Sequence, residues 1–260
     1  PVPAPLAEAA PRSARPAPAA QVVALGEQAR AGVDADVERA FAGSDVDVRT
    51  QFVACTDREA IELLQVGRAH FGLIGGSLSD RETHAGLRQT RLGVELFALA
   101  VPPRSPVRSL TRSQVRQIFT GQVQRWQELG FDGGAIVPVV PAERALAERA
   151  ERALMPGDAF ASICVRAASA RHVVDQLLQQ PGAIGIVRVT DRPPEAGQKL
   201  LQIDWVAPTP DAFGYGSYPY GVPLHLVTHG VPDERARGFE AFARSPEGRA
   251  LLGRTLAFVP

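Results

Sequence analysis

The feature that most constrains the fold is an alternation of short apolar runs with helical patterns near the start of the chain. Apolar runs predict strands at residues 21–25 and 71–74, and an alternating pattern predicts a strand at residues 46–53. Residues 34–41 predict a helix, because their apolar side chains lie four positions apart. A second helix opens at Thr56, where Thr-Asp-Arg-Glu has the spacing of a capping box. Strand–helix–strand units at this spacing form parallel sheets covered by helices, so the sequence predicts an α/β fold.

A second constraint comes from residues 110–130, which read LTRSQVRQIFTGQVQRWQELG. Thr111 and Gln114 have the spacing of a capping box, and the apolar residues that flank the cap can form a hydrophobic staple. An apolar face continues along the helix, and Gly121 predicts its end. The segment therefore predicts one short amphipathic helix, a sharp stop and a turn anchored by Trp126.

The rest of the chain continues the alternation. Residues 94–101 predict an apolar strand that ends at a proline pair, which suits a crossing point between two lobes. Further strands are predicted at residues 136–140, 183–189, 200–206 and 218–227. One helix is predicted at residues 141–154, with Pro141 in its first turn. A second begins after Ser169, which is its N-cap, and the last helix at the C-terminus begins at Ser245-Pro246.

Composition narrows the class of protein. The 260 residues are 45% hydrophobic and 22% charged, which is typical of a globular protein. The 28 basic residues balance 28 acidic ones, so nothing indicates a nucleic-acid partner or a basic membrane-binding surface. No apolar run approaches the roughly 20 residues of a membrane-spanning helix.

The N-terminal segment and the cysteines carry expectations of their own. Residues 1–20 contain six prolines and no periodic apolar pattern, which predicts a disordered linker, as often lies between a domain and an anchor or signal sequence. The start at Pro1, without a signal-peptide pattern, favours a mature or trimmed product. Cys55 and Cys164 are interpreted as two small buried side chains, with a disulfide between them as the alternative.

Six segments follow one another in the order of a known family. They are residues 69–76 (AHFGLIGG), 110–130, 181–187 (PGAIGIV), 201–210 (LQIDWVAPTP), 218–227 (YPYGVPLHLV) and 239–260. They resemble, in turn, the patterns G..DIG, LT..Q...IF.G....W.ELG, PGAIGY, L.IDGV.PT, YPL.RPLYLV and the closing F..F..S.EGQ helices. In this order they resemble the phosphate-binding proteins that serve bacterial ABC transporters, and the resemblance covers residues 21–260.

The resemblance implies a periplasmic-binding-protein-like fold of type II, in which two α/β lobes enclose a ligand. Lobe one would take residues 21–102 and 207–260, and lobe two residues 103–206. The protein would be a monomeric, non-enzymatic solute-binding protein outside the cytoplasm, tethered to the membrane through residues 1–20. Its partners would be a small anion such as phosphate and an ABC-transporter permease or another envelope protein.

The ligand site departs from the family's pattern. The family has GSS after the first strand, a serine after the third and R..GSGT at a helix start in lobe two. Here Gly26-Glu27-Gln28 follows the first strand, and Pro141 stands where the family has its arginine. The candidate ligand-binding residues are therefore Gly26, Gln28, Thr56, Ser77, Ser79, Arg144 and Ser169.

Each candidate also has a purely structural interpretation. Thr56 and Ser169 are explained as helix caps, and Ser77 and Ser79 can satisfy a turn. Arg144 can form a surface pair with Glu148, four residues on. A carboxylate at Glu27 would oppose an anion. These departures favour a second hypothesis, in which the fold is kept and the cleft serves as a protein-interaction or envelope-sensing module.

Enzymatic motifs find little support in the chain. His225 and His229 would share one face of a strand, yet no third ligand lies at a recognisable interval, so a metal site is not predicted. The P-loop, the dinucleotide-binding glycine motif and the Gly-x-Ser-x-Gly nucleophile elbow are all absent from the sequence. We therefore expect no cofactor and no catalytic residue.

Overall fold

The structure is a computed structural model, and it describes residues 21–26, 29, 33–43, 50–190 and 198–258. The predicted linker at residues 1–20, the predicted site residue Gln28 and the first part of the strand predicted at 46–53 lie outside these ranges. None of the helices within the described ranges is long and apolar enough to cross a membrane.

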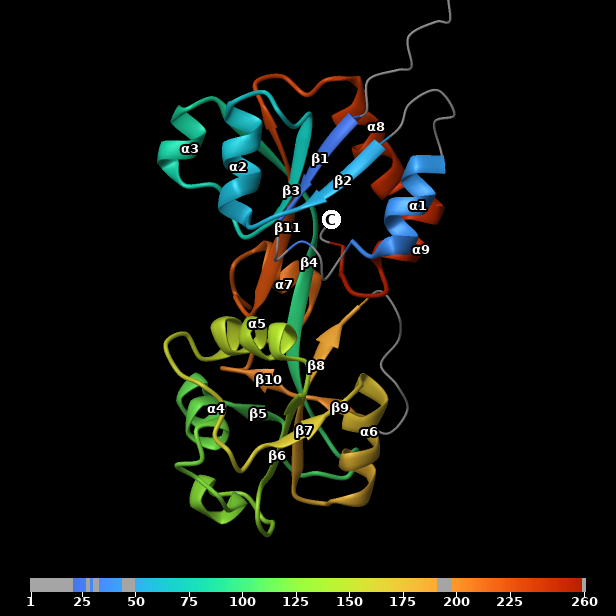
Figure 1. Cartoon of the computed structure of the whole chain (residues 1–260). Helices are drawn as coiled ribbons and strands as arrows, with labels where there is room; N and C mark the ends of the chain where they lie inside the picture. Colours follow the sequence, from blue (N-terminus) through green and yellow to red (C-terminus); the bar gives the residue numbers. More distant parts are fainter. Residues whose placement is uncertain (1–20, 27–28, 30–32, 44–49, 191–197, 259–260) are drawn as a thin grey trace, which may run out of the picture.

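One curled sheet runs through the whole molecule in the order β2-β1-β3-β11-β4-β8-β6-β7 (Figure 1). Its strands are β1 (Gln21–Leu25), β2 (Thr50–Ala54), β3 (Phe71–Gly75), β4 (Leu87–Val101), β6 (Val137–Pro141), β7 (Val165–Ala167), β8 (Ala183–Val189) and β11 (Gly221–His229). The short strand β9 (Lys199–Leu200) pairs with β4, whereas β5 (Ser109–Leu110) and β10 (Gln202–Ile203) form a separate pair. β1 is parallel to β2 and β3, which confirms the parallel arrangement predicted from the sequence.

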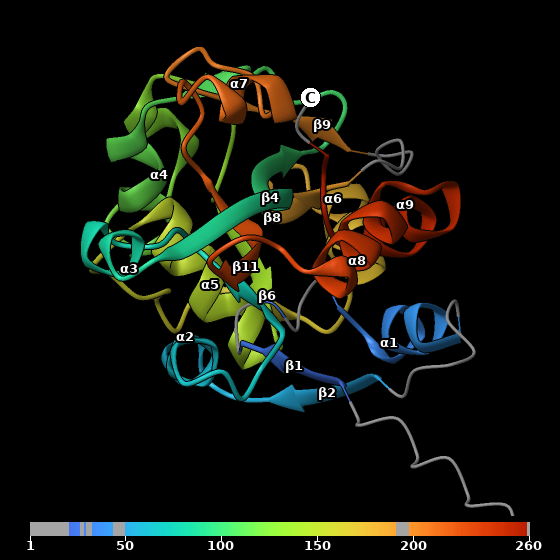
Figure 2. The same ribbon diagram turned by 90° about the horizontal axis from the view of Figure 1, so that it is seen from above.

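Helices cover both sides of the sheet. They are α1 (Ala35–Gly43), α2 (Asp57–Gln65), α3 (Asp80–His84), α4 (Arg112–Phe119), α5 (Arg144–Leu154), α6 (Ala170–Gln179), α7 (Pro210–Gly214), α8 (Glu234–Arg244) and α9 (Pro246–Leu252). Seen from above, α2 and α3 lie on one side of β11, and α1, α8 and α9 lie on the other (Figure 2). The predicted α/β class with sheets flanked by helices is therefore confirmed.

The long strand β4 joins two groups of elements. Its first part pairs with β11 from Leu87 to Leu96, and its last part pairs with β8 from Leu96 to Ala100. We call β1–β3 with α1–α3, α8 and α9 the β1 lobe, and β5–β10 with α4–α6 the β6 lobe (Figure 1). The residue bounds predicted for the two lobes stay a prediction.

Each lobe has its own hydrophobic core. Phe41, Phe71 and Phe239 pack together in the β1 lobe in edge-to-face and tilted arrangements, with ring centroids 4.9–6.3 Å apart. A separate cluster in the β6 lobe contains the buried face of α4 and Trp126. Burying apolar area in two separate clusters stabilises two bodies, and β4 and β11 connect them.

The capping motifs predicted from the sequence are present. The side chains of Thr56 and Thr111 each accept a hydrogen bond from the backbone N–H of the residue three positions later in the chain, and both capping boxes are complete. Ser245 caps α9, with a proline in its first turn. Gly121 follows the end of α4 with a φ of 76°, a left-handed conformation that favours glycine. Trp126 is buried and its indole nitrogen donates to the carbonyl of Gly182 over 3.1 Å.

Two elements differ from their predictions. The helix predicted at residues 141–154 begins at Arg144, because Pro141 is the last residue of β6 and is buried within the sheet. The strand predicted at residues 200–206 is broken, because Asp204 and Trp205 have positive φ angles of 49° and 65° and turn the chain. A single extended strand cannot contain such residues.

Candidate functional site

The carboxyl ends of the parallel strands in both lobes point toward the junction between the lobes. In the β1 lobe, Gly75 at the end of β3 pairs with Leu224, near the start of β11. In the β6 lobe, Val189 at the end of β8 pairs with Leu96 on β4, and β6 runs parallel to β8. Ligands of open α/β sheets bind beyond the carboxyl ends of strands, so this junction is the candidate site.

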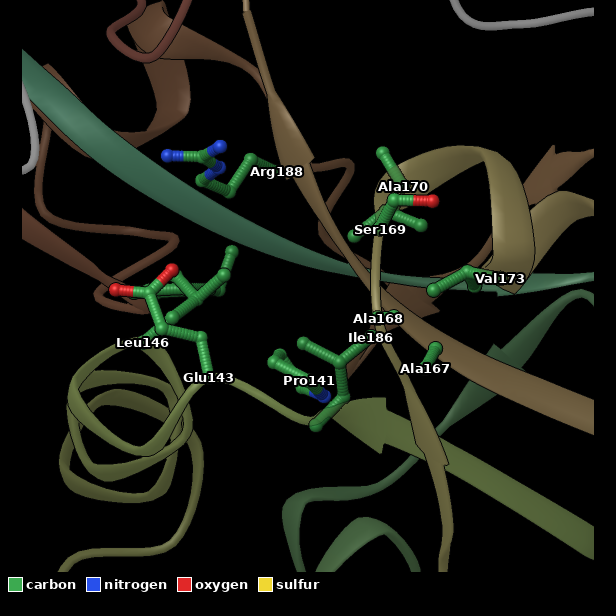
Figure 3. Close-up of a pocket in the computed structure, with 12 residues that line it drawn as sticks. Pro141, Glu143, Leu146, Ala167, Ala168, Ser169, Ala170, Val173, Ile186 and Arg188 are labelled. Carbon is green, nitrogen blue, oxygen red and sulfur yellow. The ribbon is translucent and has the colours of Figure 1, made fainter.

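A pocket of about 280 Å³ lies on the β6 side of this junction (Figure 3). The ends of β6 and β7 and the starts of α5 and α6 surround it. Its lining residues are Phe97, Pro141, Glu143, Leu146, Ala167, Ala168, Ser169, Ala170, Val173, Ile186, Val187 and Arg188. The two ionisable side chains in this lining are Glu143 and Arg188.

Figure 3 shows the guanidinium of Arg188 and the carboxylate of Glu143 on the same side of the pocket. The hydroxyl of Ser169 points the other way, toward α6, where it accepts a hydrogen bond from the backbone N–H of His172 over 3.1 Å. The Arg188 side chain is 30% exposed, so its guanidinium remains accessible from the pocket. Arg188 is therefore the cation best placed to meet a bound anion.

A buried ion network stands behind Arg188. Arg149 on α5 donates from Nε to a carboxylate oxygen of Glu95 on β4 over 2.7 Å, and both side chains are buried. Arg188 on β8 donates to the other oxygen of the same carboxylate over 3.4 Å. Two guanidinium groups thus share one carboxylate, which leaves the network with a net charge of +1. The network joins β4, α5 and β8 at the wall of the pocket.

The start of α5 offers further hydrogen-bond donors. Glu143 is its N-cap residue, and no side chain among the described residues caps this end. The first backbone N–H groups of a helix lack partners within the helix, and its dipole favours negative charge there. The helix start of α5 therefore adds to the positive field of Arg188 near the pocket, whereas the carboxylate of Glu143 opposes that field.

The predicted residues of the β1 lobe are mostly occupied with local structure. Thr56 and Ser79 cap α2 and α3, and each belongs to a complete capping box. Ser77 is exposed after β3, and its hydroxyl makes no hydrogen bond to the other described residues. A Cβ atom on Gly26 would stand 2.0 Å from a carboxylate oxygen of Asp57 and 3.0 Å from the carbonyl oxygen of Leu73, so a larger residue would displace the Asp57 side chain.

Arg144 lies outside the pocket lining. Its side chain is 92% exposed and its Nε donates to Glu148 over 2.7 Å, the surface pair that its sequence spacing predicted. Ser169 does line the pocket, whereas Gln28 is outside the described residues. The structure thus brings Ser169 together with Arg188 and Glu143, and the roles predicted for the seven candidate residues stay predictions.

Sequence reasoning missed the ion network, although one signal was available. Glu95 is the single charged residue in the apolar run at residues 92–101. A charge in a buried strand needs a partner, because burying an unpaired carboxylate is costly. Its partners Arg149 and Arg188 lie 54 and 93 positions away, and no local pattern marks them.

The two histidines considered as metal ligands contact backbone carbonyls in the structure. His225 donates from Nδ1 to the carbonyl of Gly76, and His229 contacts the carbonyl of Ala85. No group of three potential metal ligands occurs within the described residues. No disulfide joins Cys55 and Cys164, and burial raises the pKa of the Cys164 thiol to about 11. A thiol with so high a pKa is a poor nucleophile at neutral pH.

Comparison with known proteins agrees with this architecture. A curated relative is the phosphate-binding protein PstS of Bacillus subtilis, which is 25% identical over 167 residues. That match covers 63% of this chain and 54% of the relative, so the chain spans about half the length of that protein.

Solved structures share the fold at lower identity. An ABC-type phosphate transport receptor from Vibrio cholerae has a TM-score of 0.70 and 20% identity, and the match covers 92% of this chain and all of that one. A possible phosphate-binding protein from Planctomyces limnophilus has a TM-score of 0.76 and 15% identity, with 94% of both chains covered. PstS from Borrelia burgdorferi has a TM-score of 0.74 and 15% identity, covering 92% of this chain and 99% of its own.

These structural likenesses show a fold shared with phosphate receptors. The family model described as the PBP superfamily domain matches residues 12–247, which is most of the chain. The resemblance inferred from the sequence is thereby confirmed, and this chain belongs to the PBP superfamily.

Proposed function

We propose that this protein is a non-enzymatic solute-binding protein that binds phosphate or another small oxyanion between its two lobes. The observation that carries the proposal is the pocket beside Arg188, where a partly exposed guanidinium and the uncapped start of α5 converge. Guanidinium groups and helix starts are the groups that proteins most often offer to oxyanions.

The charges around the pocket favour an anion of a particular kind. The network of Glu95, Arg149 and Arg188 has one positive charge in excess, which attracts an anion. Glu143 places a carboxylate on the same side of the pocket, and a carboxylate accepts hydrogen bonds only. A protonated oxyanion such as hydrogen phosphate can donate to Glu143, whereas sulfate at neutral pH cannot. The pocket therefore favours phosphate over sulfate.

The same proposal extends to transport. Two lobes connected by β4 and β11 can close on a ligand by a hinge motion. Relatives named as ABC-type phosphate receptors and phosphate-binding proteins support a role in delivering the ligand to an ABC-transporter permease. Such a role requires a location outside the cytoplasm, with residues 1–20 as the tether.

A second candidate function is a protein-interaction or envelope-sensing module. Glu143 at the pocket weakens binding of fully ionised anions, which favours a cleft that no longer takes a small molecule. Two exposed aromatic side chains, Trp205 and Tyr215, are 74% and 89% exposed. Aromatic residues of this kind are enriched at protein interfaces.

Isothermal titration of the full chain with phosphate and with sulfate at neutral pH tests the first proposal. We expect phosphate to bind and sulfate to bind more weakly. The variant Arg188→Gln should weaken phosphate binding by roughly tenfold or more, because it removes a charge-assisted hydrogen bond. The variant Arg244→Gln is the matched control, because Arg244 forms an ion pair with Glu240 on α8 of the β1 lobe and does not line the pocket.

The outcomes separate the two candidates. Heat of phosphate binding that disappears in Arg188→Gln and persists in Arg244→Gln supports the solute-binding function. If neither phosphate, sulfate nor another small anion bound or raised the melting temperature, the solute-binding function would be wrong and the interaction module would be favoured. If both arginine variants bound phosphate with equal affinity, Arg188 would not be part of the site, and phosphate would bind elsewhere in the junction.

A further inference from the structure

A second pocket, of about 310 Å³, lies where α4, α5 and β11 meet. It shares no lining residue with the pocket beside Arg188. Its lining residues are Arg112, Arg152, Ala153, Leu154, Pro156, Pro219, Tyr220, Gly221 and Val222. The start of α4, the end of α5 and the start of β11 thus contribute to a site close to the strands that connect the lobes.

The charged side chains that line this pocket are all basic. Arg112 and Arg152 line it, and no carboxylate belongs to the lining formed by the described residues. Asp204 lies outside the lining, where it accepts from the Arg112 backbone N–H over 3.3 Å and its charge also attracts the Arg112 guanidinium. Glu148 pairs with Arg144 and also attracts Arg152, but it does not line the pocket either. The two guanidinium groups therefore present an excess of positive charge to the pocket.

Tyr220 fixes one of these guanidinium groups. Its side chain is buried, at 4% exposure, and its hydroxyl accepts a hydrogen bond from Nε of Arg112 over 3.0 Å. The guanidinium carbon of Arg112 lies 5.5 Å from the centre of the Tyr220 ring. The ring of Tyr218 packs edge-to-face against the Tyr220 ring, with 4.8 Å between the two centroids. Arg112 is thus held in place before any ligand arrives, which lowers the entropy cost of binding.

The hydroxyl of Tyr220 also has a proton to give. Among the hydrogen bonds between described residues, it acts only as the acceptor from Arg112. Because Tyr220 lines the pocket, this proton can be donated to an oxygen atom of a ligand. The remaining N–H groups of Arg112 lie beside this hydroxyl, so both can donate to one acceptor group.

The walls of the pocket suit an apolar body attached to that acceptor. Leu154, Pro156, Pro219 and Val222 supply apolar surface, and the two prolines have no N–H to donate. An ion without an apolar part would leave these walls uncovered. A carboxylate matches the flat fork of an arginine, and an apolar group behind it can cover the walls.

We infer that this pocket binds a small organic carboxylate with an apolar body, held by Arg112, Arg152 and the Tyr220 hydroxyl. Because it lies beside the start of β11, an occupant would contact two helices of the β6 lobe, α4 and α5, and a strand that connects the lobes. The site is independent of the oxyanion pocket, and either can exist without the other.

Titration calorimetry of the full chain with benzoate tests this inference. Benzoate should bind, and the variants Arg112→Gln and Tyr220→Phe should each weaken its binding measurably. The double variant Arg112→Gln/Arg152→Gln should weaken it by roughly tenfold or more. Circular dichroism confirms that each variant is folded, and Arg152→Gln alone provides a second test because Arg152 is exposed.

Two controls and a competitor decide the interpretation. Arg188→Gln and Arg244→Gln should bind benzoate as the unmodified chain does, because neither side chain lines this pocket. Failure of benzoate to bind at millimolar concentration, or equal binding by the folded double variant, overturns the inference. Loss of benzoate binding in Arg188→Gln assigns benzoate to the other pocket and also overturns it. Displacement of benzoate by phosphate at equal concentration would contradict the preference for an organic carboxylate.

Discussion

The β1 lobe and the β6 lobe use the polar side chains at their facing edges in different ways. In the β1 lobe, the hydroxyls of Thr56 and Ser79 each accept a backbone N–H and contact a glutamate three residues on. In the β6 lobe, α5 begins without a side-chain cap among the described residues, and Arg188 keeps a partly exposed guanidinium. One edge is locally satisfied, whereas the other retains donors and charge.

This difference teaches where binding chemistry can reside. The hydroxyls of Thr56 and Ser79 already donate to glutamate carboxylates, so each must give up that hydrogen bond before it can donate to a ligand, which reduces its net contribution. A second guanidinium on one buried carboxylate leaves uncompensated positive charge. The β6 lobe should therefore dominate the affinity for an anion, and the β1 lobe should contribute mainly through closure and through Ser77.

The largest expected effect comes from the buried ion network. The variant Arg149→Met leaves Glu95 buried with only the longer contact from Arg188, and should lower the free energy of unfolding by about 3–5 kcal/mol. Urea denaturation followed by circular dichroism measures this loss. The exposed pair of Arg58 and Glu62 provides the control, and Arg58→Gln should cost less than about 1 kcal/mol.

A double variant sharpens the same comparison. Glu95→Gln combined with Arg149→Met removes the buried carboxylate as well as its partner, and should recover part of the lost stability. If Arg149→Met alone were as mild as Arg58→Gln, the network would not be the buried, coupled unit that its 2.7 Å contact indicates.

The second effect concerns which arginine meets the anion. Sequence reasoning chose Arg144, whereas the pocket is lined by Arg188. Phosphate titrations of Arg144→Gln and Arg188→Gln should give an unchanged affinity for the first and a loss of roughly tenfold or more for the second. The reverse result would restore the sequence-based assignment and would require Arg144 to leave Glu148 when the lobes close.

The third effect tests whether the hydroxyls are caps or ligand donors. Thr56→Ala and Ser169→Ala should each lower the free energy of unfolding by about 1 kcal/mol, because each removes an N-cap hydrogen bond. Their affinity for phosphate should change by less than about threefold. A much larger loss of affinity in Thr56→Ala would show that the β1 edge contributes directly, and would break the contrast between the lobes.

The sequence was a good guide to the scaffold. Capping boxes, apolar periodicity and glycine stops are local signals, and they correctly placed β1, α2, α4 and α9. The predicted start of α5 was wrong because Pro141 is compatible with two patterns, the first turn of a helix and the end of a strand. Pairing with β7 and β8 on both sides of β6 decided between them.

The candidate site was harder to predict because its cations come from distant elements. Arg149 sits on a helix rich in arginine, and nothing in its immediate sequence separates it from exposed neighbours such as Arg152. Only Glu95, a charge within an apolar strand, signalled that a partner must exist. The partner becomes identifiable once the register of β4 against β8 and the position of α5 are known.

The smallest effect concerns His225, which lies in the part of β11 that pairs with β3 of the β1 lobe, beside the carbonyl of Gly76. Burial, opposed in part by the hydrogen bond to Gly76 and reinforced by the nearby charge of Arg91, lowers the pKa of His225. The unfolded chain therefore takes up this proton first, so the stabilisation is present above the ordinary histidine pKa of about 6.5 and is lost as pH falls below it. Urea denaturation at neutral and mildly acidic pH should show a smaller loss of stability in His225→Asn, whose side chain can still donate to Gly76. An equal loss in both proteins would mean that other groups, on either lobe, carry the acid sensitivity.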